Sequence, residues 1–141
     1  MDLALIFWIA HVPAVTGWLA LLILPYDARA ITFARGAAVV VALGYLLIFL
    51  WSGSAGAVLA RDYSFHGIGT FFADPRLLLL GWVHYLAFDL WVGTWEAQEG
   101  ARTGMSRLLI VPALLLTFML GPIGLLLFLL LRPRSPRPLS A

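Results

Sequence analysis

The sequence predicts an all-α integral membrane protein, a four-helix bundle with a long, partly interfacial connection between its second and third helices. Hydrophobic residues make up 62% of the 141 residues, charged residues make up 11%, and the mean hydropathy is +0.97. A soluble domain usually carries about 25% charged residues, and a chain this small cannot hide such a shortage from water. The composition argues against a soluble enzyme and against nucleic acid as a partner.

Four apolar runs are long enough to cross a bilayer, for which about 20 residues are needed. The predicted spans, which together form one transmembrane domain over 1–131, are 3–24, 35–51, 77–95 and 108–131. The first run is too long for the apolar part of a signal peptide, and it is preceded by Asp2 where a basic region would stand. We therefore expect this run to be a span.

Two segments lie outside the predicted spans. The connection 52–76 is long for a loop without structure of its own. Its aromatic residues and glycines favour a short interfacial helix with turns, and a lid over a cavity is the functional alternative. The tail 132–141 holds three Pro and three Arg and is expected to be a disordered basic end. Four crossings place both termini on one side, which a small excess of Arg assigns to the cytoplasm.

The third predicted span carries the most informative polar residues. Asp89 is the only carboxylate well inside any span. Placing an Asp at a helix centre costs about 2.5–3.5 kcal/mol, so Asp89 should face protein, either in a functional role or bonded to a neighbouring helix. Glu96 lies on the same face, about 10 Å further along the axis, and is expected near the membrane surface. His84 lies about 140° from Asp89 around the helix, as a packing residue or a base.

A metal site is a further hypothesis. His11 lies in the middle of the first span, where a hydrogen bond between helices is the simpler interpretation. Together with His84 and either Asp89 or Glu96, it could complete a set of two His and one carboxylate. Iron or another divalent metal would be the cofactor, although no spacing in the sequence requires one.

Aromatic residues and a proline supply candidate positions for binding an apolar substrate, although ordinary packing also explains them. These positions are Trp82, Tyr85, Phe88, Trp91 and Pro122. The proline also removes the backbone hydrogen bond to the Phe118 carbonyl. A bend is therefore expected there, and a neighbour or Thr117 must satisfy the freed carbonyl.

Two stretches of the C-terminal half resemble a known family. Residues 81–96, GWVHYLAFDLWVGTWE, and 109–127, LIVPALLLTFMLGPIGLLL, resemble the abscisic-acid-deficient-four-like membrane proteins of neoxanthin synthesis and their bacterial relatives. The N-terminal half resembles them only in its pattern of apolar run and prolines. The resemblance implies a four-span protein of a bacterial inner membrane, with a carotenoid or related polyene and membrane lipid as partners. Assembly into a homo-oligomer is left open.

The resemblance also implies a reaction, the acid/base conversion of a carotenoid end group by an isomerase-type enzyme. In the plant members an epoxide opens and a neighbouring C–H bond is lost to leave an allene, which requires an acid and a base but no redox cofactor. Asp89 is the candidate acid and His84 the candidate base. The alternatives are an iron-dependent carotenoid oxygenase and a non-catalytic carotenoid-binding or structural subunit.

Overall fold

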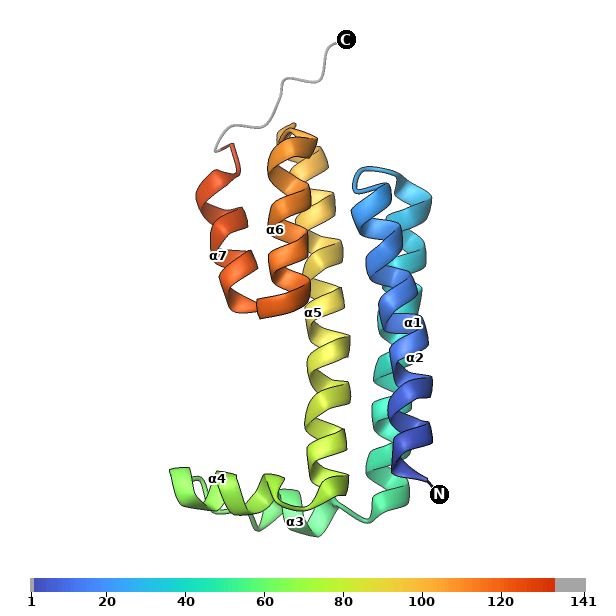
Figure 1. The fold of residues 1–141 in the computed structure, drawn as a ribbon, viewed down its shortest axis with the longest axis vertical. Coiled ribbons are helices and arrows are strands. Elements are labelled where there is room, and N and C mark those ends of the chain that lie inside the picture. The colour runs from blue at the N-terminus through green and yellow to red at the C-terminus, as the bar shows by residue number, and fades with distance from the viewer. Residues whose placement is uncertain (1, 134–141) are drawn as a thin grey trace.

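Three long helices form the body of the molecule. The computed structural model describes residues 2–133, in which α1 (Leu3–Ile23), α2 (Ala28–Ser52) and α5 (Pro75–Thr103) run alongside one another (Figure 1). Each is long and apolar enough to cross a membrane, because even 21 residues extend about 30 Å as a helix. The described residues form helices and no strands, as predicted for an all-α membrane protein.

Aspartate side chains set the start of each long helix. Asp2, Asp27 and Asp74 each stand just before a first turn and accept a hydrogen bond from a backbone N–H within it, which satisfies groups that have no partner inside the helix. Asp27 accepts two such bonds, both of 2.9 Å. This cap explains why α2 begins at Ala28, ahead of the predicted start at residue 35.

The third long helix continues past its predicted end at residue 95. It ends at Thr103 because Gly104 adopts a φ of 68°, a left-handed conformation that favours glycine. The N–H of Met105 then bonds to the Gly100 carbonyl at 2.9 Å. The extension places Glu96 well inside the helix and away from its end.

The connection between the second and third long helices contains two short helices, α3 (Ala55–Leu59) and α4 (Phe65–Phe72). They lie across one end of the long helices (Figure 1). Large apolar side chains stay exposed here, including Leu59 and Phe65. This placement agrees with the predicted partly interfacial connection.

The predicted fourth span, 108–131, is not formed as a single crossing. It is divided into α6 (Arg107–Leu120) and α7 (Pro122–Leu131), which lie side by side as a hairpin (Figure 1). Their lengths are about 21 Å and 15 Å, both short of the roughly 30 Å hydrocarbon core. The chain reverses at Gly121, whose φ of 50° and ψ of −103° suit glycine. The prediction of a four-helix bundle is therefore corrected to three long helices and a half-length hairpin.

The hairpin also changes where the chain ends. Asp2 and the end of α7 lie at opposite ends of the molecule (Figure 1), whereas four crossings predict that they lie on the same side. Residues 134–141 of the predicted disordered tail lie outside the described residues.

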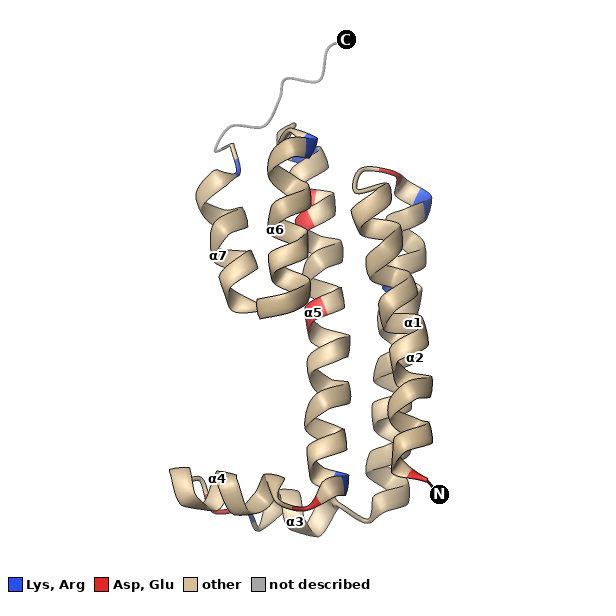
Figure 2. Ribbon diagram, in the orientation of Figure 1, with Lys and Arg blue, Asp and Glu red and all other residues tan. Residues whose placement is uncertain are grey.

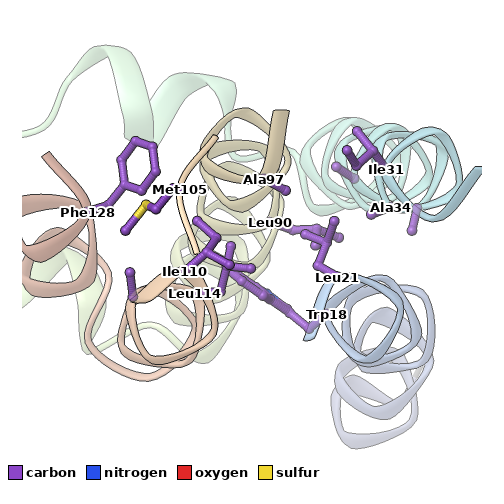
Figure 3. Packing of buried hydrophobic residues seen from close by; sticks show 13 residues of the cluster. Trp18, Leu21, Ile31, Ala34, Leu90, Ala97, Met105, Ile110, Leu114 and Phe128 are labelled. Atoms are coloured by element: carbon purple, nitrogen blue, oxygen red, sulfur yellow. The ribbon is translucent and has the colours of Figure 1, made fainter. Parts of the chain in front are cut away.

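One apolar cluster joins the hairpin to the long helices (Figure 3). Trp18 of α1, Leu90 of α5 and Leu114 of α6 are all buried in it. Helices in a bilayer associate through close packing, and Gly17 illustrates this, since a Cβ at that position would lie 2.8 Å from a Leu90 methyl carbon. Most charged residues lie near the two ends of the molecule, but α5 also carries acidic residues partway along its length (Figure 2).

Candidate active site

Two carboxyl groups of α5 face the α6–α7 hairpin and define what we call the carboxyl site. The site consists of Asp89, Glu96, Thr117 and Gly121. Asp89 is half-buried and lies beside the hairpin turn, where a Cβ at Gly121 would come within 3.0 Å of its Oδ2. The glycine therefore gives the turn its unusual backbone and also leaves room for the carboxyl. The Oδ2 atom of Asp89 is buried and has no hydrogen-bond partner within residues 2–133.

Glu96 is fully buried. Its Oε1 accepts a hydrogen bond of 2.9 Å from the Thr117 hydroxyl, whereas its Oε2 has no partner in the described part of the chain. Glu96 does not stand at the end of its helix, because α5 continues for seven further residues, and the hairpin covers this face. Its expected depth near the membrane surface stays a prediction.

Trp18 fills the space between the two carboxyl groups. Gly93 lies one turn after Asp89 and just before Glu96 on the same face of α5, and a Cβ there would come within 2.5 Å of the Trp18 ring. The Trp18 ring also packs against Phe118, with ring centroids 5.3 Å apart. The indole therefore closes the α1 side of the carboxyl site.

Tyr85 connects α5 to the turn of the hairpin. Its hydroxyl donates to the Phe118 carbonyl at 3.3 Å, which is the carbonyl that Pro122 leaves without its helical partner. The prediction that a neighbouring group satisfies this carbonyl is confirmed, and the neighbour is Tyr85. The hydroxyl of Thr117, the other candidate, donates to Glu96 instead.

His84 lies on a different side of α5 from Asp89. Its ring stacks on Phe88, with centroids 4.5 Å apart, and meets the edge of Tyr45 at 5.9 Å. It lines a cavity of about 290 Å³ that is shared with Arg61 of the connection. The structure does not bring the candidate acid and the candidate base together, in agreement with their predicted separation around the helix.

His11 packs between helices, as its position in the first span suggested. Its Nδ1 lies 2.6 Å from the Phe7 carbonyl, and its Nε2 accepts a hydrogen bond of 3.0 Å from the Trp82 indole. Both ring nitrogens therefore have protein partners. No three His, Asp or Glu side chains gather as a metal site within residues 2–133, so the four candidate ligands do not converge and the metal hypothesis stays a prediction.

The candidate substrate-binding residues divide between two sides of α5. Trp82 and Tyr85 face α1 and the hairpin. Phe88 and Trp91 line an apolar cavity of about 270 Å³ together with small residues of α2. Pro122 is exposed at the start of α7. These residues therefore do not form one continuous slot.

Sequence reasoning missed two parts of the carboxyl site, the bond from Thr117 to Glu96 and the contact between Gly121 and Asp89. The local signal for both is the Thr-x-x-x-Gly-Pro sequence at 117–122. A Gly-Pro pair commonly marks a turn, and a Thr one turn earlier can present its hydroxyl to a facing helix.

A comparison with protein families identifies the chain. The model of the family described as ABA DEFICIENT 4-like matches residues 5–128, which cover all but the first two residues of the three long helices and most of the hairpin. No curated protein and no solved structure matches the chain. The match confirms the resemblance found in the C-terminal half and extends it to the N-terminal half. The chain belongs to the ABA DEFICIENT 4-like family of membrane proteins.

Proposed function

We propose that this protein acts within the membrane on a carotenoid end group by acid/base chemistry, with Asp89 as the proton donor. The observation that supports this proposal best is the position of Asp89. The residue lies about midway along α5 and is half-buried beside the hairpin turn at Gly121. Its Oδ2 has no hydrogen-bond partner among the described residues. Ionisable groups at such depth are costly and usually functional.

The chemistry expected of the family is an isomerisation, and it balances without an electron acceptor. Asp89 gives its proton to the epoxide oxygen as the C–O bond breaks, and a base takes the proton from the neighbouring carbon as the new double bond forms. The overall composition of the carotenoid is unchanged. His84 lines a cavity on another side of α5. It therefore serves as the base only for a substrate that extends around α5 from Asp89 to that cavity.

The test is expression of the full chain in a carotenoid-producing bacterium, followed by chromatography of the pigments. We expect Asp89→Asn to abolish the new pigment, because an amide of the same shape cannot donate the proton. The matched control is Asp2→Asn, which makes the same chemical change at a helix cap where Asn serves equally well. Normal conversion by Asp89→Asn would remove Asp89 from the mechanism, and His84→Gln tests the base in the same assay.

A carotenoid-binding role without turnover is the second candidate. It is supported by an apolar groove of about 870 Å³ between α1 and α2, lined by residues such as Ile9, Val12, Leu43 and Leu47. Recovery of unchanged pigment with the purified protein, and no new pigment in the cells, would favour this role. The iron-dependent oxygenase is tested by metal analysis, with loss of bound iron on His84→Gln as the supporting result.

A further inference from the structure

Arg61 lies where two cavities meet at one end of the molecule. It belongs to the turn between α3 and α4. An outer cavity of about 460 Å³ and an inner cavity of about 290 Å³ share Arg61, Phe71 and Leu77 in their walls. A ligand that fills both cavities therefore contacts Arg61 in each of them.

The guanidinium is held in place by aromatic rings. It lies over the Tyr63 ring at 4.7 Å and near the Phe71 ring at 5.9 Å. Its Nε is buried and has no hydrogen-bond partner, and it forms no salt bridge within residues 2–133. A buried donor of a charged group is costly to leave unpaired, so the arrangement calls for an anionic ligand.

The two carboxylates that line the outer cavity are engaged elsewhere. Asp62 accepts bonds from the backbone N–H and hydroxyl of Ser64, at 2.8 and 2.6 Å, and these bonds hold the pKa of its carboxyl below the usual value. Asp74 caps α5 through the N–H of Arg76 at 2.8 Å. Two carboxylates beside the guanidinium disfavour a ligand with a net negative charge but suit one that also carries a cation.

The residues that line the two cavities differ in kind. The outer cavity brings together the polar side chains of Arg61, Asp62, His66, Thr70 and Asp74 beside apolar ones such as Ala57, Phe71 and Leu77. The inner one is lined mostly by apolar and aromatic side chains, among them Val58, Phe72 and Leu80. A guanidinium binds phosphate through paired hydrogen bonds. The interfacial position that the sequence predicts for this connection corresponds to the depth of lipid headgroups.

We propose that the two cavities hold one phospholipid whose headgroup carries both a phosphate and a primary ammonium, as in phosphatidylethanolamine. The phosphate binds Arg61, the ammonium lies near Asp62 and Asp74, and an acyl chain enters the inner cavity. This site is separate from the carboxyl site and does not depend on the proton-donor role of Asp89. Its inner cavity is the one that His84 lines, so an acyl chain bound there excludes His84 as the base for the carotenoid.

Native mass spectrometry of the full chain in detergent, with one added lipid at a time, tests the site. We expect phosphatidylethanolamine to be retained about tenfold more than phosphatidylcholine or phosphatidylglycerol with the same acyl chains, which corresponds to about 1.4 kcal/mol. Arg61→Gln should abolish this retention. The matched control is Arg76→Gln, which removes the same charge from an exposed side chain that lines neither cavity.

A second variant separates the two ends of the headgroup. Asp74→Asn keeps the helix cap but removes one charge near the ammonium, so we expect the preference over phosphatidylcholine to fall while some phospholipid is still retained. Equal retention by wild type and Arg61→Gln, or a preference for phosphatidylglycerol, would overturn the proposal. Displacement of the lipid by millimolar inorganic phosphate would overturn it too, because the site would then recognise phosphate alone. Circular dichroism confirms that each variant keeps its helices.

Discussion

At the residue scale, Asp89 and Glu96 show how surroundings separate two similar carboxyl groups. They lie on one face of α5, seven residues apart. Asp89 is partly exposed at the edge of the hairpin, whereas Glu96 is sealed beneath α6 and bonded to Thr117. A sealed group cannot reach a substrate without the hairpin moving. This difference supports the proposal of Asp89 as the proton donor, whereas Glu96 joins α5 to α6 through its bond to Thr117.

The bond between Glu96 and Thr117 gives a stability prediction. Thr117→Val keeps the shape of the side chain but leaves the buried Glu96 carboxyl without its one hydrogen bond to a described residue, at a cost of about 1–3 kcal/mol. We expect a lower thermal midpoint in detergent for this variant. Thr117→Ser keeps the hydroxyl and is the control, so an equal loss in both variants would argue against a role for the bond.

At the element scale, the hairpin depends on the close approach of α6 and α7. Gly124 of α7 lies against Thr117 of α6, where a Cβ would come within 1.9 Å of the Thr117 backbone nitrogen. Backbone cannot move aside as a flexible side chain can. The two helices therefore pack at this distance only with glycine at position 124.

Gly124→Ala is expected to destabilise the hairpin by about 1–3 kcal/mol or more, as overpacking does. Limited proteolysis and thermal unfolding in detergent measure the effect. Gly44→Ala is the matched control, because a Cβ at that helical position meets no atom within 4 Å, and alanine favours helix by about 1 kcal/mol over glycine. If both variants behaved alike, the hairpin would not depend on this contact.

Some elements could be predicted from the sequence and others could not, for physical reasons. Apolar length is sufficient to reveal α1, α2 and α5, and a lone Asp in an apolar run indicates a group that faces protein. The hairpin escapes this reasoning because 108–131 is apolar throughout, and hydropathy is the same for one bent span and for two half-length helices. Its reversal depends on the backbone of Gly121. The burial of Glu96 depends in turn on the hairpin and on the late end of α5.

At the scale of the whole molecule, the hairpin changes the predicted topology. Three crossings and a hairpin put the start of α1 and the end of α7 on opposite sides of the membrane, whereas four crossings put them on the same side. The end of α7 lies at the same end of the molecule as the α1–α2 turn, away from α3 and α4 (Figure 1). Of the described arginines, five lie toward the hairpin end, namely Arg29, Arg35, Arg102, Arg107 and Arg132, and two toward the other end, Arg61 and Arg76. The positive-inside rule then favours the hairpin end in the cytoplasm, and so predicts that the start of α1 lies on the opposite side.

Single-cysteine labelling tests this topology, and the chain has no native cysteine. We expect Ala28→Cys and Pro133→Cys to react with a membrane-impermeant maleimide from the same side, and Phe65→Cys to react from the opposite side. All three positions are exposed. Four crossings would instead group Pro133 with Phe65, so that pairing would contradict the hairpin.

Because the hairpin is only half as long as a span, the protein surface around Asp89 differs between the two halves of the membrane. Beside the hairpin the carboxyl is covered, but on the same face toward α4 the side chains of Leu78 and Trp82 remain 56% and 40% exposed. One leaflet therefore meets a sealed wall and the other meets an open flank of α5. A substrate dissolved in the bilayer is expected to approach laterally, and from the leaflet that contains α4.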